Sequence, residues 1–259
     1  MRRDRWAILG GLVGITVAAW IYLVVEMRPL SMGTTDRSMA HSMTSMVQMR
    51  TWTAAEFGLM LGMWVVMMVA MMVPTATPMT LVYSAVVRKA AREAHPVAPT
   101  FVFVAGYLAV WGAFSLAATA AQRGLEHLAL LSPTMVSVSP WLGGALLVSA
   151  GIYELTPLKR ACLAHCRAPA YFISQHWRGG FSGAFRMGVE LGAYCLGCCW
   201  ILMGLLFVGG VMNLLWIAVI ALFILLEKTA PFAETGGRVV GAAMILIGLL
   251  SFSGLVALG

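Results

Sequence analysis

Charged residues are scarce in this chain. Asp, Glu, Lys and Arg make up 10% of its 259 residues, whereas 61% are hydrophobic. A soluble domain needs far more charge to cover its surface. The apolar residues form continuous runs, and about 20 such residues in a helix cross a bilayer. The short alternating segments typical of membrane β-barrels are missing. The sequence therefore predicts an all-α, polytopic transmembrane helical bundle whose solvent is the lipid bilayer.

Several functional motifs are also missing. The chain has no Walker loop, which argues against ATP-driven pumping, and no GxSxG or HExxH motif, which argues against the common hydrolases. Its five cysteines are clustered in a membrane protein and are not a secreted disulfide framework. The formal charge of +7 comes with no stacking motif or basic helix face, which excludes nucleic acid as a partner. We expect a protein that is not an enzyme on its own.

The apolar runs predict about seven helices in a single transmembrane domain, residues 1–259. They are residues 6–25, 57–79, 100–121, 141–156, 187–208, 213–226 and 238–258. A methionine-rich extracytoplasmic loop at about 26–55 and a Cys/His-containing cytoplasmic connector at about 157–186 separate some of them. With the N-terminus inside and the C-terminus outside, inside segments hold 13 of the 17 basic residues and outside segments hold 4. The positive-inside rule then predicts a multi-pass protein of the bacterial inner (cytoplasmic) membrane.

The outer loop contains Met39, His41, Met43 and Met46. Methionine is unusual in a polar loop because its thioether prefers burial. Soft thioethers select Cu(I), and they do not pair oxidatively as thiols do. We favour copper contact here over the alternative, an amphipathic segment that lies on the membrane surface.

The helix expected over residues 57–79 continues this pattern inward. Six methionines fall within residues 60–72, and Met63, Met67 and Met71 lie on one stripe of the helix. Two interpretations stand equally: packing between helices, or a thioether ladder for a soft metal.

The helix expected over residues 187–208 carries Cys195, Cys198 and Cys199, preceded by Glu190. Cys195 and Cys199 share a face because they are four residues apart. Cysteine and glycine also allow close helix packing, but we favour a metal site for this dense group of soft ligands.

The connector carries a second cluster, Cys162, His165 and Cys166. If it is helical, the three side chains share a face. Thiolates with an imidazole can bind zinc or copper. A c-type haem is excluded, since its motif places histidine directly after the second cysteine.

Three acids fall near the inner ends of the expected helices: Glu154, Glu190 and Glu227. Ionisable residues at membrane depth are costly and are functional candidates by default. The alternative is that they reach the interface and pair with a basic residue. The basic residues available are Lys159, Arg160, Arg186 and Lys228. We favour ion pairing for Glu227, and a role at the metal site for Glu154 and Glu190.

Three stretches carry a family resemblance: WVVMMVAMMVPTATP at 64–78, YELTPLKRACLAHCR at 153–167, and residues 186–228 with MGVELGAYCLGCCW and LLFVGGVMNLLW. In these motifs the chain resembles a bacterial family of predicted metal-binding integral membrane proteins, a domain of unknown function. The resemblance implies metal binding without naming the metal. The family commonly has a histidine after the acid of the third stretch, where this chain has Leu191. If that histidine is a ligand in the family, Glu190 or Cys195 replaces it here.

Three functions fit these features. The first is a copper-binding membrane protein that handles Cu(I), by transport or by delivery to a partner such as another membrane subunit or a metallochaperone. The second is a metal- or redox-active subunit of a larger membrane oxidoreductase. The third is a structural or assembly subunit whose methionines and cysteines only pack. Copper is the expected metal, with zinc or another transition metal as the alternative.

Overall fold

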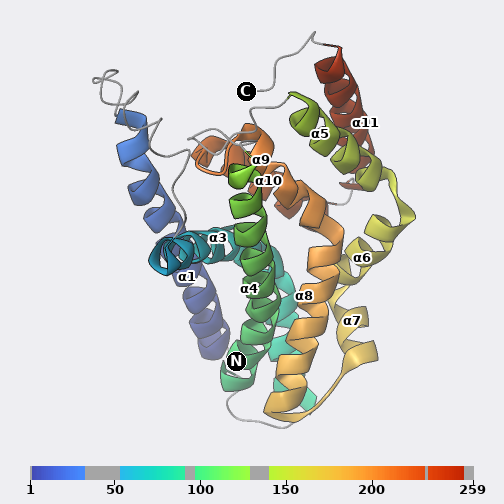
Figure 1. Cartoon of the computed structure of the whole chain (residues 1–259). Coiled ribbons are helices and arrows are strands. Elements are labelled where there is room, and N and C mark those ends of the chain that lie inside the picture. The colour runs from blue at the N-terminus through green and yellow to red at the C-terminus, as the bar shows by residue number, and fades with distance from the viewer. Residues whose placement is uncertain (1, 33–52, 91–96, 129–139, 231–232, 254–259) are drawn as a thin grey trace.

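The structure is a computed structural model that describes residues 2–32, 53–90, 97–128, 140–230 and 233–253. Every regular element in these residues is a helix, as the sequence predicts (Figure 1). The helices are α1 (Arg2–Met32), α3 (Ala54–Ala90), α4 (Val97–His127), α5 (Pro140–Leu155), α6 (Pro157–Arg167), α7 (Pro169–His176), α8 (Gly180–Gly204), α9 (Leu206–Gly209), α10 (Leu214–Thr229) and α11 (Ala233–Phe252).

Five segments of the described chain are long and apolar enough to cross a membrane, which makes this a membrane protein. They are Asp4–Glu26, Ala54–Lys89, Ala98–His127, Gly180–Gly209 and Glu234–Phe252. The two remaining apolar helices are shorter, α5 and α10 having 16 residues each. The predicted number of seven crossings and the orientation of the termini stay predictions.

The cytoplasmic connector predicted at 157–186 is largely helical. It consists of α6, α7 and the first turns of α8, which begins seven residues earlier than the sequence suggested, at Gly180. Thr156 starts α6 because its hydroxyl accepts a hydrogen bond from the Lys159 amide (3.3 Å) and Pro157 occupies the first turn. α6 therefore begins directly after α5 ends.

α3 continues through two prolines. Pro74 lacks an amide hydrogen, so the carbonyl of Ala70 loses its helical partner. The indole nitrogen of Trp20 in α1 donates a hydrogen bond to this carbonyl, at 3.2 Å. The proline thus creates an acceptor that ties α1 to α3, and the helix continues to Ala90 rather than ending near residue 79.

Two helix pairs pack backbone to backbone: α4 with α8, and α5 with α11. A Cβ atom added at Gly188 in α8 would lie 2.0 Å from the Phe103 carbonyl oxygen of α4. A Cβ at Gly151 in α5 would lie 2.5 Å from the Gly241 carbonyl oxygen of α11. Small residues allow this close approach in membrane helices. The α4–α8 contact fixes the height of α8 relative to α4, and with it the position of the cysteines.

Candidate metal centre

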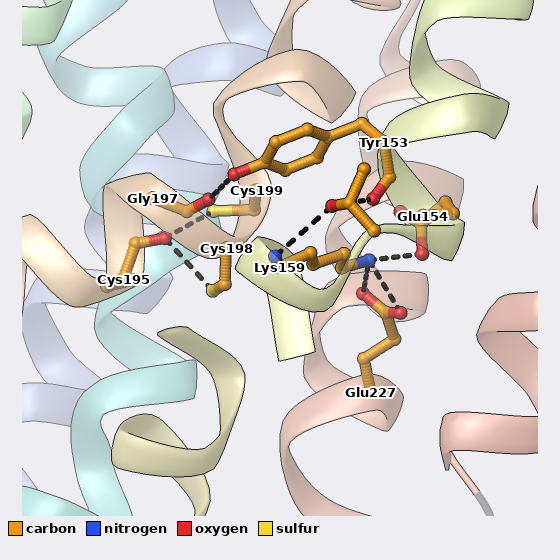
Figure 2. A network of polar contacts seen from close by, with 9 residues as sticks. Tyr153, Glu154, Lys159, Cys195, Gly197, Cys198, Cys199 and Glu227 are labelled. Atoms are coloured by element: carbon orange, nitrogen blue, oxygen red, sulfur yellow. Dashed lines mark hydrogen bonds and ion pairs between the residues drawn. The ribbon is translucent and has the colours of Figure 1, made fainter. Parts of the chain in front are cut away.

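α8 carries three of the five cysteines, and all three side chains are buried. Cys195, Cys198 and Cys199 are 1%, 2% and 1% exposed. The thiols of Cys198 and Cys199 each donate a hydrogen bond to the Cys195 carbonyl oxygen, at 3.0 Å (Figure 2). These bonds satisfy the thiols within the helix in the absence of an ion.

α6 packs against α8 and brings the two remaining cysteines to the same interface. The Cys162 sulfur lies 2.9 Å from the position that a Cβ atom at Gly197 would take, so the missing side chain of Gly197 makes room for it. The Cys166 thiol lies close enough to the thiols of Cys195 and Cys198 to interact with both. The two cysteine clusters that the sequence predicts separately are therefore one cluster in the structure.

The two thiols of α6 are held in their protonated form. Burial, and after it the neighbouring Cys198, raises the pKa of the Cys162 thiol. The hydrogen bonds with Cys195 and Cys198, followed by burial, hold the pKa of Cys166 well above its usual value. Because metals bind the thiolate, an ion that binds either residue must displace a proton.

Two side chains from other helices contact the Cys195 sulfur. The ammonium group of Lys228 in α10 donates a hydrogen bond to it at 2.8 Å, and the Tyr107 hydroxyl of α4 lies 3.0 Å away. Lys228 also donates to the Thr75 hydroxyl of α3, at 3.2 Å. Sequence reasoning missed Tyr107 and Thr75, and it considered Lys228 only as an ion-pair partner. The one signal available was a basic residue in the last turn of an apolar helix.

The acids Glu154 and Glu227 meet at Lys159 (Figure 2). The Lys159 ammonium donates to both oxygens of Glu227, at 2.7 and 2.8 Å, and also to the Glu154 carboxylate. The ion-pair alternative thus describes both acids, and the ion pairs are buried inside the protein, since Lys159 is only 2% exposed. Glu227 pairs with Lys159 and not with its chain neighbour Lys228, because adjacent helical residues point in different directions.

Glu190 lies among basic residues. Its carboxylate accepts a hydrogen bond from Arg178, at 2.6 Å, and lies 3.5 Å from Arg186. The structure therefore places this acid in an ion-pair network on the first half of α8.

His165 lies beside the cysteine cluster on α6. Its ring stacks on Tyr194 with 4.2 Å between centroids. The Nδ1 atom lies 2.9 Å from the Ala161 carbonyl oxygen. A carbonyl can only accept, so Nδ1 carries the hydrogen, and Nε2 of the neutral ring keeps its lone pair.

The predicted methionine sites divide into two groups. Met63, Met67 and Met71 are buried in the core between helices. Met39, His41, Met43 and Met46 lie outside the described residues. The thioether ladder therefore stays a prediction.

Within the part of the chain that the structure describes, no three or more His, Cys, Asp or Glu side chains are arranged as a formed metal site. The thiols of Cys198 and Cys199 point to a carbonyl and not to a common centre. Rotation about the Cα–Cβ bond of Cys198 would turn its sulfur from that carbonyl and free it to bind an ion with Cys166 and Cys195. The available donor atoms are thiol sulfurs, which suit a soft cation such as Cu(I).

Comparison with known proteins relates the chain to one family model. A family model, PpoB2, described as "Copper chaperone", matches residues 61–251. No curated protein and no solved structure matches the chain. The matched range includes all five cysteines and Lys228.

Proposed function

The chain belongs to the PpoB2 family of copper chaperones, and on this premise we propose that it holds Cu(I) where α6 meets α8 and delivers it to a partner protein. Copper handling follows from the family. The delivery step and the binding residues are proposals. The observation that carries them is that all five cysteines gather at one interface between two helices.

The chemistry of the thiols favours Cu(I) over harder ions. Soft sulfur ligands select Cu(I), and carboxylates and water suit magnesium or calcium. Cys166, Cys195 and Cys198 interact with one another and form the proposed first set of ligands. Cys162 and Cys199 lie next to this set and supply alternative ligands during transfer.

The charge around Cys195 fits a bound cuprous thiolate. One Cu(I) ion held by two or three thiolates carries a net negative charge, and burying such a charge without a partner is costly. The Lys228 ammonium, 2.8 Å from the Cys195 sulfur, offsets it. A charge-assisted hydrogen bond at this position stabilises the loaded state.

The exposure of the thiols favours delivery over permanent storage. The three cysteines of α8 are buried, whereas Cys162 and Cys166 of α6 are half-buried. An incoming thiol of a partner protein can reach α6 first and take the ion by ligand exchange. The positive-inside count would put this transfer on the cytoplasmic side of the inner membrane.

The first test is the metal content of the detergent-purified full chain after loading with Cu(I). We expect near-stoichiometric copper in the wild type and its loss in the double variant Cys195→Ser/Cys198→Ser. Leu202→Val, a buried apolar change on the same helix, should keep the copper. Wild-type protein without copper, or with zinc instead, would refute the proposed site.

A second test separates the three modes of handling. Loaded protein is mixed with a Cu(I) chelator, and the chain is also reconstituted in sealed vesicles. Delivery predicts fast transfer to the chelator and no copper inside the vesicles. Copper accumulation in the vesicles would favour transport instead. Bound copper that never exchanges would favour a fixed centre in an oxidoreductase.

A further inference from the structure

The ion-pair triad behind the cysteine cluster has two acidic groups and one basic group among its buried side chains. Glu154 comes from α5, Lys159 from α6 and Glu227 from α10, and all three side chains are buried. Lys159 donates to both carboxylates, and the two carboxyl groups also interact with each other directly. We propose that Glu154, Lys159 and Glu227 form a proton-binding site.

The charge count gives the first argument. With both carboxylates ionised, two negative charges face one ammonium group, and the triad carries a net charge of minus one. A buried net charge is strongly unfavourable in a low-dielectric interior. Two carboxylates that share a site resist ionising together, so one of them retains a proton. One proton makes the triad neutral.

An unpartnered oxygen gives the second argument, independent of the count. The Oε1 atom of Glu154 is buried and has no hydrogen-bond partner among the described residues. A carboxylate oxygen that is ionised and buried normally accepts a hydrogen bond, and leaving it without one is costly. A neutral carboxylic acid at Glu154 removes most of this cost. The proton is therefore assigned to Glu154.

Charged groups at the rim offer a route to solvent. A small cleft beside the triad is also lined by Arg160 of α6 and by Glu234 and Arg238 of α11. These three side chains are exposed. The backbone of α11 closes over the triad at Gly237, where a Cβ atom would lie 2.8 Å from Glu227 Oε1. Protons can exchange through this rim while the triad itself stays buried.

The triad shares two helices with the cysteine cluster. α6 carries Lys159 and, one and two turns later, Cys162 and Cys166. α10 carries Glu227 in the triad and Lys228 on Cys195. Loss of the proton leaves the buried triad with one negative charge in excess, and we expect this to weaken the packing of α6, which presents the half-buried thiols, against α5 and α10. This second step, pH control of access to the copper site, rests on the proposed function, whereas proton binding does not.

Infrared spectroscopy of the copper-free full chain in detergent tests proton binding directly. A protonated carboxyl group has a C=O stretch that is distinct from that of a carboxylate and shifts in heavy water. We expect this band at neutral pH in the wild type and its loss in both Glu154→Gln and Glu227→Gln. Gln mimics the neutral acid in size and polarity, so Glu154→Gln should fold. Glu190→Gln is the matched control, because Glu190 lies outside the triad and is ion-paired with Arg178 and Arg186.

An absent band in the wild type, or a band that survives in both triad variants, would overturn the proposal. The coupling step has its own readout, the alkylation rate of Cys162 and Cys166 as a function of pH. The wild-type rate should rise several-fold more steeply at alkaline pH than the rate of Glu154→Gln, which has no proton to lose. Parallel profiles would refute the coupling step. Neither experiment uses copper, so both results are independent of whether the copper site is correct.

Discussion

Replacing Gly188 with alanine should separate α4 from α8 and weaken the copper site from a distance. The added Cβ atom would lie 2.0 Å from the Phe103 carbonyl oxygen, and ordinary contact begins at 3.4 Å, so the two helices must move apart by roughly 1.4 Å along this direction. The clashing atom belongs to the backbone and cannot rotate away. Overpacking of this kind typically costs about 1–3 kcal/mol, and occasionally more.

The same movement reaches the cysteine cluster, because Tyr107 on α4 lies 3.0 Å from the Cys195 sulfur. Gly188→Ala should therefore lower both the stability in a denaturant titration and the Cu(I) affinity in a chelator competition. Gly112→Ala on α4 is the matched control, since its Cβ would meet no atom within 4 Å. That change should be neutral or slightly stabilising because alanine is the better helix former. Equal behaviour of the two variants would refute the reasoning.

Three further predictions follow from single contacts. Lys228→Met removes the charge-assisted hydrogen bond to the thiolate, worth about 1.5–3 kcal/mol, and should weaken Cu(I) binding on the order of tenfold to a hundredfold in chelator competition. Trp20→Phe leaves the buried Ala70 carbonyl without a partner and should lower the free energy of unfolding by about 1–3 kcal/mol in a denaturant titration. The pKa values of Cys162 and Cys166 are raised, so both thiols are protonated in the metal-free protein. Because Cu(I) binding must displace these protons, the Cu(I) affinity should rise with pH, which competition titrations over a pH series can check.

Exposed residues of the same types provide the controls. Lys89→Met, at the end of α3, should leave the Cu(I) affinity unchanged, and Trp141→Phe should leave the stability unchanged. A Lys89 variant as weak as the Lys228 variant would mean that overall charge, and not the contact with Cys195, controls binding. A copper affinity that is flat with pH would contradict the displacement of thiol protons.

The positions of the long helices could be predicted from the sequence because apolar runs determine them directly. The bounds were less accurate where a helix continues into polar sequence. α4 extends to His127, beyond the predicted end at residue 121, and α3 passes two prolines. The helices of the connector could not be predicted from apolar runs, because α6 has 11 residues and α7 has 8. Neither is long enough to produce the hydrophobic signal of a transmembrane helix.

The two cysteine clusters of the candidate site could be found from their spacing in the sequence. The contact between the cluster on α6 and the cluster on α8 could not be predicted. Which face of α6 meets α8 depends on the absence of a side chain at Gly197 and on the angle set by Thr156 at the end of α5. Tyr107 and Lys228 are far from the cysteines in sequence, and only the packing of α4 and α10 brings them to Cys195. The spacing of residues within one helix predicts which side chains share a face of that helix. It does not predict which other helix packs against that face.

The shortness of α5 has a consequence for the membrane around it. Its 16 residues span about 24 Å at 1.5 Å per residue, less than the ~30 Å of a typical hydrocarbon core. A helix of this length that crosses a bilayer either thins it locally or sinks one end below the headgroups. If α5 crosses the bilayer, Glu154, one residue before the end of α5, would lie closer to the bilayer midplane than the ends of the 31-residue α4. The hydrocarbon core on this flank would then have to be thinner than around the longer helices.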